Sequence, residues 1–296
     1  MFTHSYRLTN KNNFYMKTST LFNVAIASAA VLAIGAAGCS STSESKNANG
    51  DKGIASVPVQ SELLSISKTY PGYNGEDSCS LTLNAVIDYP TVVGSNDIAP
   101  LQEAIKDVVF NNQTGASIES LMDSFATEVQ SYDLNINPEV TGTPANLSEV
   151  YAYYTDVTLS RTELNSKMIT YQLVDSRYLG AAHPMTYSRA FTYAFEEKQM
   201  LTLENMFKPD KMDVVFSAVN VTLAQQYGVQ EGELQSAGFY QNAVGVPNLV
   251  SVQNDMIVFH YNPYDIAPHS AGAIDVAVSP IMVKEALTPL AEKLLF

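Results

Sequence analysis

Alternation of apolar and polar residues with a period of two constrains the fold of this chain most. Three such segments follow one another closely, at 151–159, 168–178 and 187–195. Side chains of a β-strand point to opposite faces in turn, so this alternation predicts half-buried strands. Strands that lie so close along the chain favour an antiparallel meander.

Helices and further strands flank this meander. Apolar residues spaced three and four apart predict the helices. The predicted elements are, in chain order, a strand at 81–89, helices at 98–109 and 118–129, the three strands above, a short strand at 200–203, a helix at 212–228, a hairpin of 250–252 and 257–261, a strand at 274–278, and a terminal helix from 280 that Pro289 kinks or splits. Helices grouped in this way predict an α+β fold with antiparallel or mixed sheets, a few packed helices and two similar-sized subdomains.

The first 38 residues are typical of a targeting segment. Met16 and a lysine are followed by an apolar run to Ala37, and Gly38 and Cys39 end it. Small residues before a cysteine predict a lipoprotein signal peptide that starts at Met16. A transmembrane anchor is the alternative, but a run of about 17 residues is short for a membrane span. We expect a lipid on Cys39 and an extracytoplasmic place in the cell envelope, at the outer membrane or on a periplasmic face.

The rest of the chain divides into a tether and a folded part. Residues 39–60 are rich in Ser, Asn, Gly and Lys, which predicts a flexible tether. The folded part is expected to form an N-terminal subdomain at 61–184 and a C-terminal subdomain at 185–296. Cys79 is the one cysteine left after lipidation. We expect it to be a buried apolar residue, with a reactive or intermolecular thiol as the alternatives.

The charge of the chain narrows its partners. The full chain has 16 Lys+Arg and 30 Asp+Glu, a net charge of -14. Cleavage before Cys39 removes Arg7, Lys11 and Lys17 and no acid, so 13 bases and 30 acids remain, a net charge of -17. Such a chain lacks the basic surface that nucleic-acid binding needs, so nucleic acid is excluded as a partner. The same charge suits a strongly basic protein partner.

Sequence motifs of catalysis and metal binding are absent. The chain has no H-E-x-x-H, C-x-x-C, G-x-S-x-G, Walker or dinucleotide motif. His183, His260 and His269 would form a three-histidine site if they met in space. Unrelated strand and turn residues are the favoured interpretation, and we expect no catalytic residue, no metal and no cofactor.

Two loops between predicted strands have an unusual composition. Glycine, proline and aromatic residues make both loops rigid, and rigid aromatic side chains provide contact area at a low entropy cost. The residues predicted to bind a ligand are Tyr178, Gly180, His183 and Pro184 in the first loop and Tyr261, Tyr264, Asp265 and His269 in the second. The alternative is that the tyrosine rings close the end of the core.

These loops resemble the pattern of a known family of extracytoplasmic domains. The family is shared by the lysozyme-sensing anti-sigma factor RsiV and the N-terminal region of the peptidoglycan deacetylase PdaC. The matching residues are Tyr178, Gly180, Ala182, His183, Pro184, Phe191, Tyr193, Phe195, Leu201, Leu203, Phe207, Gly272 and the run at 264–268. The resemblance extends over 80–284 and is more specific in the C-terminal half. Ala181 departs from the pattern, because the family usually has a second glycine there.

The resemblance implies a sensing or binding module. Only 15 residues precede Met16, and no deacetylase domain follows Phe296, so neither an anti-sigma role nor a deacetylase is expected. We expect a non-enzymatic binding module that Cys39 anchors to the membrane, with a lysozyme-like wall hydrolase or peptidoglycan as its ligand. The alternative is an envelope glycan hydrolase or deacetylase that uses His183, His269 and Asp265.

Overall fold

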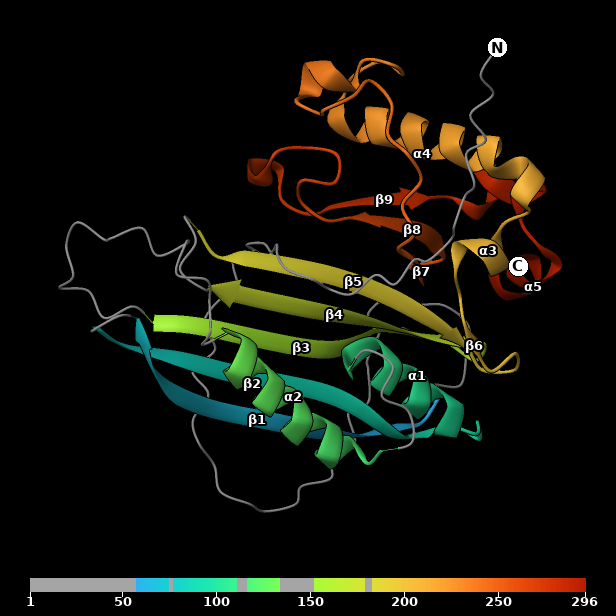
Figure 1. Ribbon diagram of the computed structural model, residues 1–296. Helices are drawn as coiled ribbons and strands as arrows, with labels where there is room; N and C mark the ends of the chain where they lie inside the picture. Colours follow the sequence, from blue (N-terminus) through green and yellow to red (C-terminus); the bar gives the residue numbers. More distant parts are fainter. Residues whose placement is uncertain (1–56, 75–76, 111–115, 134–151, 179–182) are drawn as a thin grey trace, which may run out of the picture.

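The computed structural model describes residues 57–74, 77–110, 116–133, 152–178 and 183–296, and these form two β-sheets with helices (Figure 1). The large sheet is mixed and its six strands lie in chain order. These strands are β1 (Val59–Asn74), β2 (Asp77–Val93), β3 (Ala152–Leu164), β4 (Met168–Tyr178), β5 (Met185–Ala194) and β6 (Gln199–Met200). The small sheet is antiparallel and consists of β7 (Val250–Gln253), β8 (Met256–Tyr261) and β9 (Ile274–Val278). The predicted α+β class is therefore confirmed.

The helices α1 (Ala99–Phe110) and α2 (Ile118–Asp133) cover one face of the large sheet (Figure 1). Leu101 and Ile105 of α1 are fully buried and belong to one core cluster with Ile87 of β2. Both helices lie between β2 and β3 in the chain, and these two strands pair in parallel. A parallel pair requires a long crossover, which the two helices provide.

The strand β1 was not predicted. It pairs with β2 in antiparallel register along its whole length and begins at Val59, inside the predicted tether of 39–60. Leu64 and Ile66 of β1 pack against the core, while Ser65 and Ser67 face away from it. The side chain of Cys79 in β2 lies outside the described part of the chain.

The predicted meander is confirmed, because β3, β4 and β5 pair in antiparallel order. The large sheet also continues through β5 and β6, past residue 184, where the predicted subdomain boundary lies. Of the predicted strand at 200–203, only Met200 lies in a strand, as the last residue of β6. Thr202 then caps α3 (Leu203–Met206) by accepting a hydrogen bond from the Asn205 N–H.

The C-terminal elements pack around α4 (Met212–Tyr227), which ends at Gly228 as predicted. The hairpin of β7 and β8 turns at Asn254 and Asp255, whose φ values of 50° and 58° fit the left-handed positions of a tight hairpin. The predicted terminal helix is wrong over its first half. Pro280–Ala286 forms a 3-10 segment, and a separate α5 (Pro289–Leu295) begins after Thr288. The predicted split at Pro289 is confirmed.

A ring of hydrogen bonds joins the two sheets. The Val252 N–H of β7 donates to Thr192 Oγ1 at 2.8 Å, and Thr170 Oγ1 donates to the Val252 carbonyl at 2.8 Å. The two hydroxyls lie 2.7 Å apart, so Thr192 donates to Thr170 and completes the ring. Val252 lies in β7, an edge strand of the small sheet, and side chains of the large sheet pair with its backbone groups.

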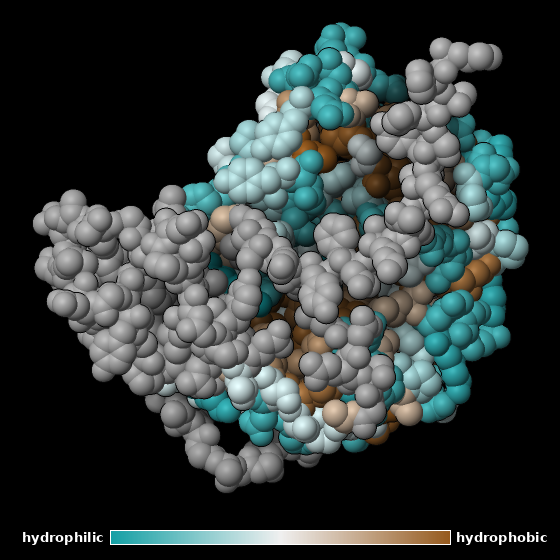
Figure 2. All heavy atoms as spheres, viewed as in Figure 1, coloured by the Kyte–Doolittle hydropathy of each residue, from teal (hydrophilic) through white to brown (hydrophobic). Residues whose placement is uncertain are grey.

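The surface of the described residues is mixed. Among the residues that are coloured in Figure 2, hydrophilic ones predominate at the surface, and hydrophobic ones show between α1 and α2 and in the C-terminal part. Among the described helices, none is long and apolar enough to cross a membrane.

Candidate functional site

The two predicted loops meet at the end of the large sheet. The ring centroids of His183 and His269 are 3.9 Å apart, with an angle of 51° between the ring planes. The Tyr264 ring lies 5.7 Å from the His269 ring. Gly180, also predicted for this site, lies outside the described residues. We name His183, Tyr264, Asp265 and His269 the loop cluster.

Local hydrogen bonds hold the second loop in shape. The carboxylate of Asp265 accepts a hydrogen bond from the Asn262 N–H at 2.7 Å. The Asn262 side chain in turn accepts one from the Ser188 N–H of β5 at 2.9 Å, which joins this loop to the large sheet. The Tyr264 N–H donates to the Ala267 carbonyl at 3.1 Å. Hydrogen bonds therefore order this loop and attach it to both sheets.

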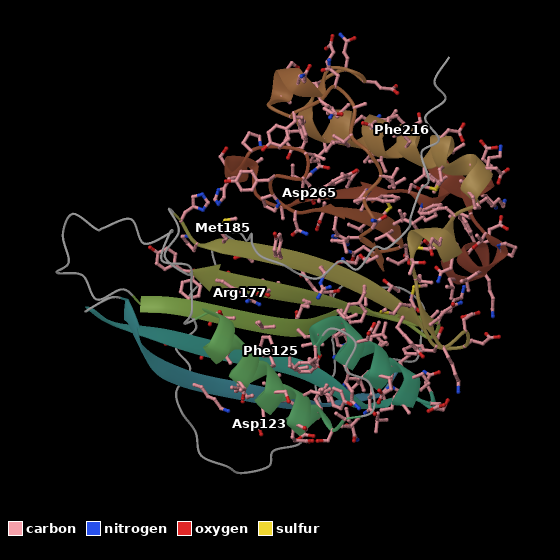
Figure 3. All side chains as sticks on the ribbon, viewed as in Figure 1. Asp123, Phe125, Arg177, Met185, Phe216 and Asp265 are labelled. Carbon is pink, nitrogen blue, oxygen red and sulfur yellow. The ribbon has the colours of Figure 1, made fainter. Side chains whose placement is uncertain are left out.

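Tyr264 has a strained backbone and a solvent-exposed ring. Its φ is 65°, in the left-handed region that residues other than glycine rarely adopt. Its side chain is nevertheless 46% exposed, so burial of the ring does not compensate for the strain. Strained residues that the surrounding structure holds in place are concentrated at binding and catalytic sites. The next residue in the chain is Asp265, which Figure 3 labels.

The other predicted residues make different contacts. Tyr261 is buried and donates its hydroxyl to the Gly245 carbonyl at 2.7 Å, and burial raises the pKa of this hydroxyl. The Pro184 carbonyl lies 3.2 Å from His183 Nδ1. Tyr178 packs beside Tyr154 of β3, with 6.3 Å between the ring centroids.

The local environment shifts two titratable groups. Burial lowers the pKa of His269, the neighbouring His183 lowers it further, and a hydrogen bond with the Pro184 backbone opposes the shift. Burial raises the pKa of Asp265, and the hydrogen bond from Asn262 opposes that shift. The loop cluster therefore favours a neutral imidazole next to exposed aromatic surface.

A second exposed tyrosine beside the loop cluster was missed in the sequence. Tyr240 is 47% exposed, and its N–H donates to the Ile266 carbonyl at 2.9 Å. Gln235 donates its side-chain amide to the Tyr240 carbonyl at 3.0 Å. Tyr240 lies in irregular chain with no periodic pattern, so only the fold could bring it to this loop.

His260 does not join the other two histidines. Its Nε2 lies 2.7 Å from Ser251 Oγ, and its Nδ1 lies 2.7 Å from Asp275 Oδ1. These contacts have the connectivity of a serine hydrolase triad. The exposure of the residues is the reverse of that in such a triad, because Ser251 is fully buried and the Asp275 side chain is 57% exposed. Within the described ranges, no group of three His, Cys, Asp or Glu residues could hold a metal ion.

The predicted lipidation site, Cys39, lies outside the described residues.

Comparisons with known proteins match parts of the chain. Residues 204–279 match the model of DUF3298, described as a protein of unknown function. A protein of Mycobacterium tuberculosis named Esterase Rv3036c is 29% identical over 119 residues, which are 38% of this chain and 48% of that protein. Immunogenic protein MPB64 of Mycobacterium bovis is 30% identical over 105 residues, 33% of this chain and 43% of that protein. The chain thus spans less than half the length of these relatives.

Two solved structures share the fold. A DUF3298-family protein from Bacteroides fragilis superposes with a TM-score of 0.65 and 17% identity, over 80% of this chain and 98% of that one. A DUF3298-family protein from Pseudomonas aeruginosa has a TM-score of 0.54 and 15% identity, over 78% and 95% of the two chains. The chain therefore has the fold of solved DUF3298-family proteins, and its residues 204–279 match the model of that family, whose function is unknown.

Proposed function

We propose that this chain is a non-enzymatic binding module of the cell envelope, anchored by a lipid on Cys39, and that the loop cluster contacts its ligand. The observation that carries the proposal is Tyr264, an exposed aromatic residue held at a φ of 65°. A ligand that packs on this ring would provide the stabilisation that burial does not.

The neighbouring residues support a contact surface. Tyr240 and Tyr264 offer two exposed phenol rings, and aromatic residues are the commonest anchors of protein interfaces. Backbone hydrogen bonds connect both residues to the same loop, so their backbones are held in fixed positions. A preorganised surface pays less entropy on binding than a mobile one.

The proposed ligand is a lysozyme-like wall hydrolase, with peptidoglycan as the other candidate. The net charge of -14, or -17 after the expected cleavage, favours a basic protein by long-range attraction. We also propose that this chain is related to the extracytoplasmic domains of RsiV and PdaC.

Titration of the full chain with lysozyme, at low and at high salt, tests this function. We expect binding that weakens with salt, because screening reduces attraction between opposite net charges. Tyr264→Ala should weaken binding about tenfold or more if the ring is an anchor. Phe216→Ala is the matched control, since Phe216 is 42% exposed and lies on α4 rather than on either loop (Figure 3).

Sedimentation with insoluble peptidoglycan provides the second arm. Binding to peptidoglycan alone, lost in Tyr264→Ala, would identify the wall as the ligand. Absence of binding in both arms would refute the proposed function. Equal losses in Tyr264→Ala and Phe216→Ala would refute the loop cluster as the contact site.

A hydrolytic function is the second candidate, and the contacts among Ser251, His260 and Asp275 favour it. One relative is named an esterase, over less than half of its length. The full burial of Ser251 opposes this candidate, because a substrate must reach the nucleophile. A glycan hydrolase or deacetylase that uses His183, His269 and Asp265 is the other form of this candidate.

Labelling and turnover assays separate the two functions. A fluorophosphonate reagent and short acyl esters test Ser251, with Ser251→Ala as the control that must lose any reaction. Peptidoglycan fragments test the loop cluster, with His183→Ala and His269→Ala as controls. Turnover that depends on one of these sets would replace the binding proposal, and absence of turnover removes both enzymatic candidates.

A further inference from the structure

A small pocket lies on the helix-covered face of the large sheet. Its apolar lining consists of Val109 of α1, Phe125 of α2, Val157 of β3 and Leu173 of β4. Figure 3 labels two of the lining residues, Phe125 and Arg177, and Figure 2 shows hydrophobic residues in this part of the face. A small-molecule site is typically an apolar hollow into which a few polar groups converge.

Polar side chains from β4 and β5 complete the lining. Asp175, Arg177, Tyr187 and Arg189 all face the pocket. The Nε and Nη2 groups of Arg177 donate to the two carboxylate oxygens of Asp175, each at 2.8 Å. Such a two-point pair largely neutralises both charges. The other positively charged side chain of the lining is Arg189.

Arg189 is held in the pocket wall by a backbone contact. Its Nη2 donates to the Val108 carbonyl at 2.7 Å, near the end of α1. A guanidinium has five N–H donors and stays charged in proteins. Burial lowers the pKa of Arg189, and the nearby Asp175 and Asp107 oppose that shift. Among the described residues, the contact with Val108 uses one of these donors, and a partly desolvated guanidinium is a strong anion ligand.

We propose that this pocket binds a monocarboxylate on a short aliphatic stem, with Arg189 as the residue that binds the carboxylate. The planar fork of the guanidinium matches a carboxylate, and the apolar wall suits a small alkyl group. The cavity volume is about 40 Å³. A water needs roughly 10–15 Å³ on the same scale, so the space fits about three waters or one such group. A dianion such as phosphate suits the pocket less well, because Arg189 is the one cation of this lining that is not in the Asp175–Arg177 pair.

This site does not depend on the loop cluster, so it stands or falls separately from the proposed function. Two sources share the required chemistry, a free organic acid and the carboxyl end of a peptide. Propionate represents the first source and N-acetylalanine the second. N-acetylalanine amide is the neutral control, and inorganic phosphate is the dianion control.

Titration of the full chain with these four compounds, followed by NMR, tests the site. We expect propionate or N-acetylalanine to bind, with the tighter one identifying the source, and both controls to bind more weakly. Arg189→Lys keeps the charge and a donor for Val108 but loses the fork, so binding should weaken about tenfold. Arg161→Lys on β3 is the matched control, because Arg161 is not part of the pocket lining.

Phe125→Trp is a second variant in case Arg189→Lys does not fold, because the larger ring fills the pocket from α2. A melting curve of each variant establishes that it is folded. The proposal is overturned if neither carboxylate binds, if the amide or phosphate binds as tightly, or if a folded Arg189→Lys or Phe125→Trp binds like the unchanged chain.

Discussion

Replacement of Thr192 by valine tests the hydrogen-bonded ring that joins the two sheets. Valine has the shape of threonine but no hydroxyl, so the Val252 N–H loses its acceptor at 2.8 Å. Thr170 and Thr192 are both fully buried, which prevents water from replacing the lost bond. A buried donor without a partner costs about 1–3 kcal/mol. For a chain of this size each kcal/mol lowers the melting temperature by roughly 2–4 °C.

Urea denaturation of the variants measures this loss. Thr192→Val should lower the free energy of unfolding by about 2 kcal/mol. Thr158→Val on β3 is the control, because Thr158 is exposed, and its stability should stay within about 0.5 kcal/mol. Thr170→Val also leaves the Thr192 hydroxyl without its acceptor, and the double variant removes that hydroxyl. The loss of stability in the double variant should therefore be smaller than the sum of the two single losses.

Two results would refute this reasoning. One is a Thr192→Val protein as stable as the Thr158→Val control. The other is a double variant whose loss equals or exceeds the sum of the single losses, because a closed ring cannot give independent terms.

Three further predictions concern the C-terminal part. Asn220→Leu should lower the free energy of unfolding by about 2–5 kcal/mol in urea, because the buried amide donates to the Val244 carbonyl at 2.9 Å and accepts from its N–H at 2.7 Å. Gly238→Ala should cost about 1–2 kcal/mol from a φ of 94° alone, with no clash at the new methyl group. The lowered pKa of His269 means that the unfolded chain takes up its proton more readily, so this contribution to stability is present above about pH 6.5 and is lost as the pH falls. Melting temperatures from about pH 7.5 to about pH 5.5 should fall less in His269→Gln and in His183→Gln than in the unchanged chain, and equal falls would contradict the histidine contact.

Local patterns predicted most of the elements. Alternation located β2 to β5, and apolar spacing located α1, α2 and α4. The terminal helix was partly wrong because a proline after a serine fits a 3-10 segment as well as an α-helix. The missed β1 contains its own alternation around Leu64 and Ile66, but its start is hidden in a polar tether composition.

Contacts between distant segments could not be predicted in the same way. The parallel pairing of β2 with β3 depends on how the crossover helices pack, which no local pattern encodes. The unusual composition of the two loops is visible in the sequence, yet their contact through His183 and His269 is a property of the folded chain. Ser251, His260 and Asp275 come together only because of the register of three strands. The pocket around Arg189 combines residues from five elements, so no sequence motif marks it.

The parallel pair of β2 and β3 has a consequence for the order of folding. The hairpin of β1 and β2 and the meander of β3 to β5 each involve neighbouring strands, so either can form early. Their union must wait until residues 94–151 have been gathered into a crossover, which carries the entropy cost of closing a long loop. We therefore expect the joining of these two halves to limit the folding rate. A protein exported unfolded would expose the unpaired edges of β2 and β3 during that interval, and it would depend on other factors to shield them.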